Sequence, residues 1–233
     1  MGGQVAALVP AAGRGERLGP GTPKALRELA GAPMLVHAVH ALASSRQVDC
    51  IVIAAPETEV ESVRRLLGQQ DYPCDVSVVT GGETRQESVA RALIALPDDV
   101  DIVLVHDAAR PLVPAEVIER VVAAVRDGHD AVVPAIALVD TIKRVDASGD
   151  VVETVDRTTL RAVQTPQGFT RPVLMRAHAA ADDVVTDDAG LAERIGVTVH
   201  VVEGHEDALK VTRPNDLVIA EAIIAKRRQV GGA

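Results

Sequence analysis

The sequence predicts an α/β fold in which a mostly parallel sheet carries helices on both faces. Short Val- and Ile-rich runs alternate along the chain with longer stretches of helical period. This alternation is typical of strands joined by helical crossovers, whose right-handed connections make neighbouring strands parallel. The 233 residues are 47% apolar, which is enough to bury the core of one α/β domain. We therefore expect a single domain over residues 1–233.

The expected elements follow one another regularly as far as residue 135. Pro56 ends a buried apolar run and suits the first turn of a helix, which explains one strand-to-helix boundary. The expected strands are Val5–Pro10, Cys50–Ala55, Asp75–Val79, Asp101–His106 and Asp130–Ala135. The expected helices are 33–44, 56–67, 84–96 and 114–126.

The rhythm changes between residues 138 and 161, where we expect an inserted β-arm. Two short strands, Thr141–Val145 and Val151–Val155, flank a turn-forming run at 146–149. A two-stranded hairpin is marginally stable alone in water, so we expect the arm to pack against a second subunit and form a homodimer. The expected elements beyond it are a short extended run at 162–164, helices at 171–181, 187–195 and 214–228, a strand at 198–202 and a frayed tail at 229–233.

Composition excludes several classes of protein. A formal charge of −9 opposes binding to a phosphate backbone, and one Tyr, one Phe and no Trp provide almost no surface for base stacking. No apolar run approaches the roughly 20 residues that span a bilayer, and the N-terminus lacks the basic region of a signal peptide. We expect a cytoplasmic protein that binds neither nucleic acid nor membrane, with Cys50 and Cys74 as reduced structural thiols.

A glycine-rich loop follows the first expected strand. Ala11, Ala12, Gly13 and Gly15 let a ligand approach the backbone closely, and successive N–H groups there can bind an anion. The spacing G-x-G-x-x-x-G is one residue too long for a dinucleotide fingerprint, and no Gly-Lys-Ser/Thr of a Walker A loop follows. The alternative to an anion-binding loop is a turn with a purely structural role.

Two cations, Arg17 and Lys24, lie in and just beyond this loop. Cations held beside backbone N–H donors make a clamp for a triphosphate, although they are also common as solvated surface residues.

Asp107 follows the expected strand Asp101–His106. Ligands of open α/β sheets bind at the carboxyl ends of the strands, and Mg²⁺ usually takes one or two carboxylates together with substrate phosphates. We therefore predict Asp107 as a magnesium ligand, with a plain helix cap as the alternative. His106 is interpreted as structural.

Six motifs in order give the chain a specific resemblance over residues 5–225. They are P-A-A-G-x-G-x-R with a later P-K, G-G-x-x-R-x-x-S at 81–88, L-V-H-D-A-A-R-P at 104–111, Q-T-P-Q at 164–167, T-D-D at 186–188 and K-V-T-R-P at 210–214. In this combination the chain resembles the 2-C-methyl-D-erythritol 4-phosphate cytidylyltransferases, which have a Rossmann-like nucleotidyltransferase fold. Relatives often have Asp in place of Glu83 and Ser in place of Gly190.

The resemblance implies a CTP- and Mg²⁺-dependent transfer of CMP to a polyol phosphate, with release of pyrophosphate. It implies catalytic roles for Arg17, Lys24 and Lys210 and a metal-binding role for Asp107. The implied CTP-binding residues are Ala11, Ala12, Gly13, Gly15, Gly82, Glu83, Ser88 and Arg110. The implied acceptor-binding residues are Thr141, Arg157, Thr165, Thr186 and Lys210, the first two reaching across the dimer.

Three alternatives stay open from the sequence. The acceptor could be ribitol 5-phosphate, the enzyme could prefer another nucleotide or a sugar 1-phosphate, or the chain could be a catalytically silent nucleotide-binding protein. The length of the sequence also leads us to expect a monofunctional enzyme without the cyclodiphosphate synthase domain of some family members.

Overall fold

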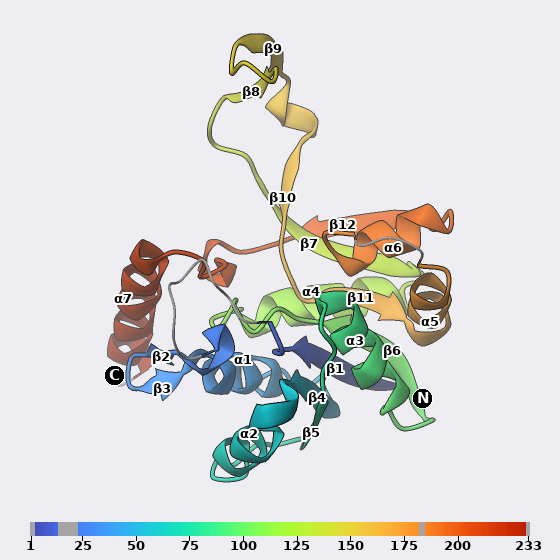
Figure 1. Ribbon diagram of the computed structural model, residues 1–233, viewed down its shortest axis with the longest axis vertical. Helices are drawn as coiled ribbons and strands as arrows, with labels where there is room; N and C mark the ends of the chain where they lie inside the picture. The colour runs from blue at the N-terminus through green and yellow to red at the C-terminus, as the bar shows by residue number, and fades with distance from the viewer. Residues whose placement is uncertain (1–2, 14–22, 182–184, 232–233) are drawn as a thin grey trace.

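The computed structural model describes residues 3–13, 23–181 and 185–231, and its centre is an eight-stranded sheet (Figure 1). From one edge to the other the order is β5, β4, β1, β6, β11, β7 and β12. Strand β10 also pairs with β7, on the same side as β11 but farther along the strand. The strands are β1 Gln4–Pro10, β4 Cys50–Ala55, β5 Asp75–Thr80, β6 Val100–Val105, β7 Ala131–Ala137, β10 Arg161–Val163, β11 Gln167–Thr170 and β12 Val199–Glu203.

Most neighbouring strands of this sheet are parallel, as the sequence predicts. The exceptions are β10 and β11, which run antiparallel to their partners, so that β11 separates β6 from β7. The sequence prediction assigned no strand to Gln167–Thr170. Its four residues include a glycine and lack an alternating apolar pattern, yet Phe169 is fully buried in the middle of the sheet.

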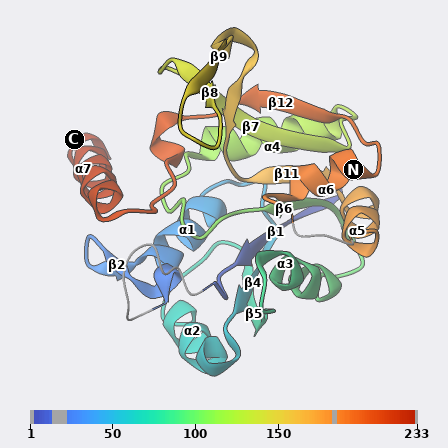
Figure 2. The ribbon, with the colours of Figure 1, turned by 45° about the horizontal axis from the view of Figure 1, so that its top comes forward.

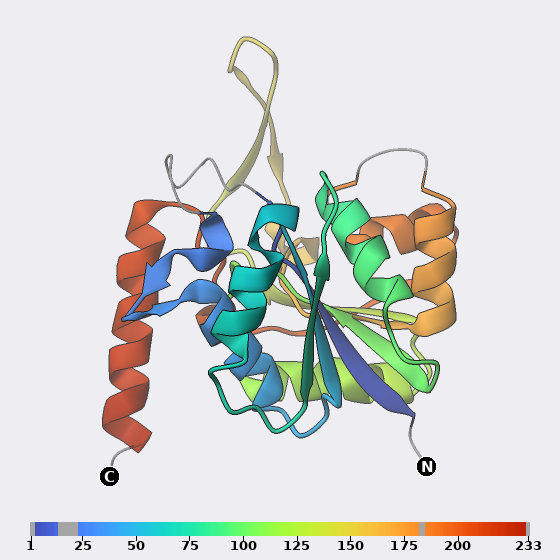
Figure 3. The same cartoon turned by 60° about the horizontal axis from the view of Figure 1, so that its bottom comes forward.

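Helices cover both faces of the sheet, which confirms the predicted α/β architecture (Figures 2 and 3). Alternate residues of β1 face opposite ways: Val5, Ala7 and Val9 join one core with α1, α2 and α4, whereas Ala6 and Leu8 join another with α3, α5 and α6. The helices are α1 Met34–Ala43, α2 Val60–Leu67, α3 Arg85–Ile94, α4 Ala115–Arg126, α5 Arg171–Ala179, α6 Asp188–Arg194 and α7 Pro214–Gly231.

Several predicted boundaries need correction. The helix expected to end at residue 228 continues to Gly231, so the prediction that 229–233 frays was wrong for 229–231, and 232–233 lie outside the described residues. The helix expected from Pro56 begins as a 3₁₀ turn, Glu57–Glu59, and becomes α-helical only at Val60. A short hairpin, β2 Glu28–Leu29 with β3 Ala32–Pro33, was not predicted, and α7 packs against it through Leu29.

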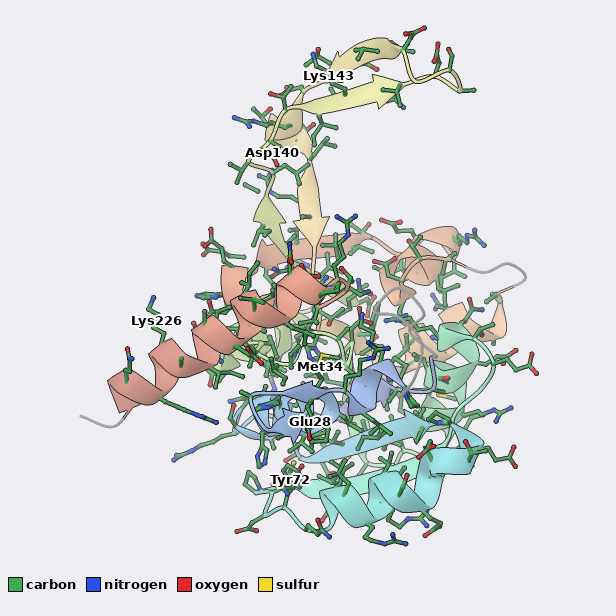
Figure 4. All side chains as sticks on the ribbon, turned by 60° about the vertical axis from the view of Figure 1, so that its left-hand side comes forward. Glu28, Met34, Tyr72, Asp140, Lys143 and Lys226 are labelled. Atoms are coloured by element: carbon green, nitrogen blue, oxygen red, sulfur yellow. The ribbon has the colours of Figure 1, made fainter. Side chains whose placement is uncertain are left out.

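The predicted arm is present as the hairpin β8 Ile142–Val145 and β9 Val151–Val155, followed by the 3₁₀ turn η4 Arg157–Thr159. It extends away from the body of the molecule (Figure 1). Figure 4 shows Asp140 near the narrow connection to the body and Lys143 on the hairpin itself. Most side chains of this segment are exposed, so the body of this chain does not cover them.

Gly168 tests how closely β11 packs against α4. A Cβ at this position would lie 2.5 Å from Val121 Cγ1, which is too close for two carbon atoms. We expect Gly168→Ala to lower the free energy of unfolding by about 1–3 kcal/mol, because overpacking a dense core forces its neighbours to shift. Urea denaturation measures this change.

The double variant Gly168→Ala/Val121→Ala is the control, because it removes the methyl group that the new Cβ would meet. We expect it to lose less stability than the sum of the two single changes. Additive losses would show that Val121 is not the obstacle.

Candidate functional site

A cavity of about 240 Å³ opens at the carboxyl ends of β1 and β6, where the sequence predicts a ligand site. The loop after β1 and the loop after β6 form adjacent parts of its wall because these strands are parallel neighbours. The lining residues are Pro10, Ala11, Ala12, Gly13, Lys24, Ala25, Arg85, Ser88, Asp107, Ala108, Ala109 and Lys210.

The cavity brings together part of the predicted site. From the predicted set, the cavity lining includes Ala11, Ala12, Gly13, Lys24, Ser88, Asp107 and Lys210. Others lie outside this lining: Gly82, Glu83, Arg110, Thr141, Arg157, Thr165 and Thr186. Gly15 and Arg17 belong to 14–22, outside the described residues.

The wall beside the glycine loop is formed by a close approach of two backbones. Gly81 donates its N–H to the Ala55 carbonyl at 2.7 Å, and a Cβ at Gly81 would lie 2.6 Å from Ala12 Cβ. The loop therefore has room for alanine at position 12 only because position 81 is glycine.

The Ser88 hydroxyl is held inside the turn before α3. It accepts the Gly82 N–H at 3.0 Å and donates to the Thr84 carbonyl at 2.9 Å. Thr84 caps α3 in a reciprocal capping box with Glu87, whose carboxylate also accepts the Glu83 N–H at 2.8 Å. The roles of Gly82, Glu83 and Ser88 in nucleotide binding stay predictions.

The Asp107 carboxylate lies between two cations. Lys210 Nζ is 2.7 Å from Oδ2, and Arg85 Nε is 3.2 Å from Oδ1. Burial alone would raise the pKa of Asp107, but the charges of Arg85 and Lys210 outweigh it and hold that pKa well below its usual range. Asp107 is therefore ionised at neutral pH, with a cation at each oxygen.

Thr165 and His106 support the backbone of Asp107 through a chain of hydrogen bonds. The Thr165 hydroxyl accepts the Asp107 N–H at 3.0 Å and lies 3.1 Å from His106 Nδ1, while His106 Nε2 lies 3.0 Å from the Arg110 carbonyl. A carbonyl only accepts, so Nε2 carries the proton and Nδ1 accepts from Thr165. All three residues are bonded within the protein, which agrees with a structural His106.

Arg110 and Gln164 form hydrogen bonds with the segment that leads to Lys210. The Arg110 guanidinium donates to the Ala208 carbonyl at 2.7 Å and to the Val163 carbonyl at 3.1 Å. The Gln164 side chain donates to the His205 carbonyl and accepts the His205 N–H, at 2.9 and 3.0 Å. These bonds join β10, at the root of the arm, to the segment leading to Lys210.

The structure adds two residues to which the sequence reasoning gave no role. Arg85 lines the cavity, and its Nη1 lies 2.6 Å from Oδ2 of the buried Asp188. Both residues occur within the quoted motifs, but their positions, 103 residues apart, contain no signal that they form a pair.

A family model described as 2-C-methyl-D-erythritol 4-phosphate cytidylyltransferase matches residues 5–226. The chain belongs to this family. An enzyme of that name from Streptomyces avermitilis is 56% identical, over 97% of this chain and 94% of its own. Another from Frankia casuarinae is 60% identical, over 96% of this chain and 82% of its own.

Solved structures extend the likeness to the fold. The 4-diphosphocytidyl-2C-methyl-D-erythritol synthase of Anaerococcus prevotii superposes with a TM-score of 0.82 at 27% identity, covering 96% of this chain and 99% of its own. The cytidylyltransferase of Thermus thermophilus gives 0.75 at 35% identity, covering 94% and 98%. The Rossmann-like fold of this family is therefore the fold of this chain.

Of the five acceptor residues that the family resemblance implies, Lys210 lines the cavity and the other four lie outside its lining, in three places. Thr165 lies beneath Asp107, as described above. Thr141 and Arg157 are exposed on the arm, where the Arg157 guanidinium donates to the Val139 carbonyl. Thr186 is exposed beside α6, in a separate shallow cleft with Val185 and Arg194. One chain therefore does not assemble these four side chains at the cavity that contains Asp107.

Among the described residues, no group of three or more His, Cys, Asp or Glu side chains is arranged to hold a metal ion. Asp107 is the one carboxylate in the described cavity lining. Nor does any described helix have the length and apolar character needed to cross a membrane.

Burial of His106 makes stability depend on pH. It lowers the pKa of His106 from 6.5 to about 4, against the opposing effect of Asp107. Between these two pH values His106 is protonated in the unfolded chain but neutral in the folded chain. The free energy of unfolding therefore falls as the pH decreases from 6.5 toward 4. The shift corresponds to at most about 3 kcal/mol.

Urea denaturation between pH 7 and about pH 4.5 measures this slope. We expect His106→Gln to flatten it, because this variant has no imidazole at the buried position. An unchanged slope in His106→Gln would show that other groups cause the pH dependence.

Proposed function

We propose that this protein transfers CMP from CTP to 2-C-methyl-D-erythritol 4-phosphate, giving 4-diphosphocytidyl-2-C-methyl-D-erythritol and pyrophosphate. This is a step of the non-mevalonate route to isoprenoids. The observation that supports it most is the cavity at the carboxyl ends of β1 and β6, which combines the glycine loop with Lys24, Asp107 and Lys210 in a member of the cytidylyltransferase family. The ribitol 5-phosphate alternative is not favoured by the relatives that match.

The reaction needs no nucleophilic side chain, because the acceptor already carries a phosphate oxygen. That oxygen attacks the α-phosphorus of CTP, a new P–O bond forms, and the bond to the pyrophosphate leaving group breaks in line with it. The protein's tasks are orientation and neutralisation of the negative charge that develops. Lys24 and Lys210, which line the cavity together with Arg85, are proposed to do this work, and Arg17 is proposed to join them.

Asp107 is proposed to hold Mg²⁺. The donor set fits, because Asp107 supplies a carboxylate in the described cavity lining and Mg²⁺ commonly binds one or two carboxylates together with substrate phosphates. When bound, the ion supplies positive charge that neutralises the triphosphate. The low pKa of Asp107 keeps the carboxylate ionised for this purpose.

The remaining binding roles are proposals that follow the family resemblance. Ala11, Ala12, Gly13, Gly15, Gly82, Glu83, Ser88 and Arg110 are proposed to bind CTP. Thr141, Arg157, Thr165, Thr186 and Lys210 are proposed to bind the acceptor. The contacts of Arg110 and Thr165 make indirect roles the better supported ones, since Arg110 fastens the Lys210 segment and Thr165 supports Asp107.

The arm is proposed to form a homodimer and to complete the site of the partner. Exposed apolar residues support this proposal: Val139 is 82% exposed, Val151 60% and Val152 63%. Exposed apolar side chains on a projecting arm are typical of an interface. We place the reaction in the cytoplasm, because both substrates are highly charged and do not cross a bilayer unaided.

Pyrophosphate release with CTP and Mg²⁺ tests the function, with methylerythritol 4-phosphate and ribitol 5-phosphate offered in parallel. We expect turnover with the first acceptor and little with the second. Lys24→Ala is the control for the site and should lose about 10² to 10³ in kcat, because it removes one preorganised charge. Preference for ribitol 5-phosphate would contradict the acceptor assignment, and equal rates for Lys24→Ala and wild type would contradict the site.

Mixing two defective variants tests whether the arm acts across the dimer. Arg157→Ala should raise the acceptor KM with little change in CTP affinity. If Arg157 serves the partner's site, a mixed dimer with Lys24→Ala contains one intact site, and random mixing recovers about a quarter of wild-type activity at low acceptor concentration. If Arg157 serves its own site, each site in the mixed dimer keeps one defect and mixing recovers nothing.

A further inference from the structure

The buried carboxylate of Asp188 has no role among the catalytic and binding residues proposed for the reaction. Its side chain is 1% exposed, at the first position of α6, and it is absent from the cavity lining. Burying a carboxylate is costly unless it is paired and hydrogen-bonded, so its partners indicate what it does.

Asp188 has two partners, one at each oxygen. Oδ1 lies 3.0 Å from His178 Nε2, on α5, and Oδ2 lies 2.6 Å from Arg85 Nη1. The same guanidinium reaches Oδ1 of Asp107 through its Nε, at 3.2 Å. Arg85 therefore bridges a carboxylate inside the protein and the carboxylate at the cavity.

The planar guanidinium makes this bridge directional. Its N–H donors are fixed relative to one another, so a group held at Nη1 also sets the direction of Nε. With Arg85 bound to Asp188, Nε points at Asp107 Oδ1, and Asp107 Oδ2 faces Lys210 at 2.7 Å. A lysine in place of Arg85 would supply the charge without this orientation.

Both ends of the bridge start from capped helix termini. Arg85 is the first residue of α3, whose cap is the box formed by Thr84 and Glu87. Asp188 is the first residue of α6, where Asp187 accepts the Gly190 N–H at 3.1 Å. Capped helix ends vary little in position, which suits groups that must align a carboxylate.

Stability alone is a weak reason for such an arrangement. Well-packed apolar residues are often as stabilising as a buried ion pair, or more so. Orientation of a cavity group is a benefit that apolar residues cannot provide.

We propose that Asp188 is a positioning residue for the nucleotidyl transfer, and that it acts through Arg85 to fix the Asp107 carboxylate in the cavity. This inference rests on the proposed function. It assigns Asp188 no contact with either substrate.

Four variants test it by pyrophosphate release under saturating CTP: Asp188→Asn, Arg85→Ala, the double variant, and Asp187→Asn as the matched control. Asp187→Asn removes one negative charge from the neighbouring residue. Its amide oxygen can still accept the Gly190 N–H of the helix cap, although the bond from Gln167 Nε2 is lost. The two Asp187 oxygens accept from Gly190 and Gln167 and not from Arg85. We expect Asp188→Asn to lower kcat about 10- to 100-fold, with the acceptor KM unchanged. Asp187→Asn should stay within about 3-fold of wild type, as expected for a change that preserves its cap.

The double variant separates positioning from a general structural effect. If Asp188 acts through Arg85, the double variant turns over within about 2-fold of Arg85→Ala alone, because the interaction is already lost. Independent losses that multiply would overturn the proposal, as would an Asp188→Asn enzyme with wild-type kcat. If Asp188→Asn does not fold, as judged by circular dichroism, Arg85→Lys replaces it and should show the same loss of kcat.

The wild-type protein in the same assay separates a failure of the proposed function from a failure of the role proposed for Asp188. A wild type that releases no pyrophosphate overturns the proposed function, and this inference with it. Normal wild-type turnover with an undiminished Asp188→Asn enzyme overturns this inference alone.

Discussion

The ionised carboxylate of Asp107 is the constraint on which the site depends. It is nearly buried, at 9% exposure for the residue, and a charge in that place must be compensated. Two cations compensate it from segments distant in the sequence, Arg85 at the start of α3 and Lys210 in the segment before α7. The compensation of this one charge therefore depends on three parts of the chain, which the fold places beside one another.

Strand β11 makes the second half of this arrangement possible. It enters between β6 and β7 in the antiparallel direction, directly after the turn that contains Thr165. Thr165 consequently lies beneath Asp107, and Gln164 lies beside the segment that leads to Lys210. A sheet with β6 and β7 paired directly would lack this support. Gly168 in β11 is part of this arrangement, because the absence of a side chain lets α4 pack against the strand.

The arm and the body meet at β10, which has consequences for function. Arg161–Val163 leaves the arm and pairs with β7, and the Val163 carbonyl accepts from Arg110. Arg110 also holds the Ala208 carbonyl, two residues before Lys210. The root of the arm, the Asp107 loop and the Lys210 segment are thus joined by a few hydrogen bonds. These bonds fix the position of the arm root relative to the site within one chain.

The sequence by itself determined the α/β class, the parallel β1, β4, β5 and β6 series, the arm and the loop residues of the cavity. These features follow from local information: apolar periodicity, proline and glycine positions, and short motifs at strand ends. Tertiary structure decided the antiparallel β11 and the bridge from Asp188 through Arg85 to Asp107. A four-residue strand takes its place from its neighbours rather than from its own pattern. An ion pair between residues 103 positions apart exists only because α3 and α6 start beside each other in the fold, and no spacing in the sequence records that distance.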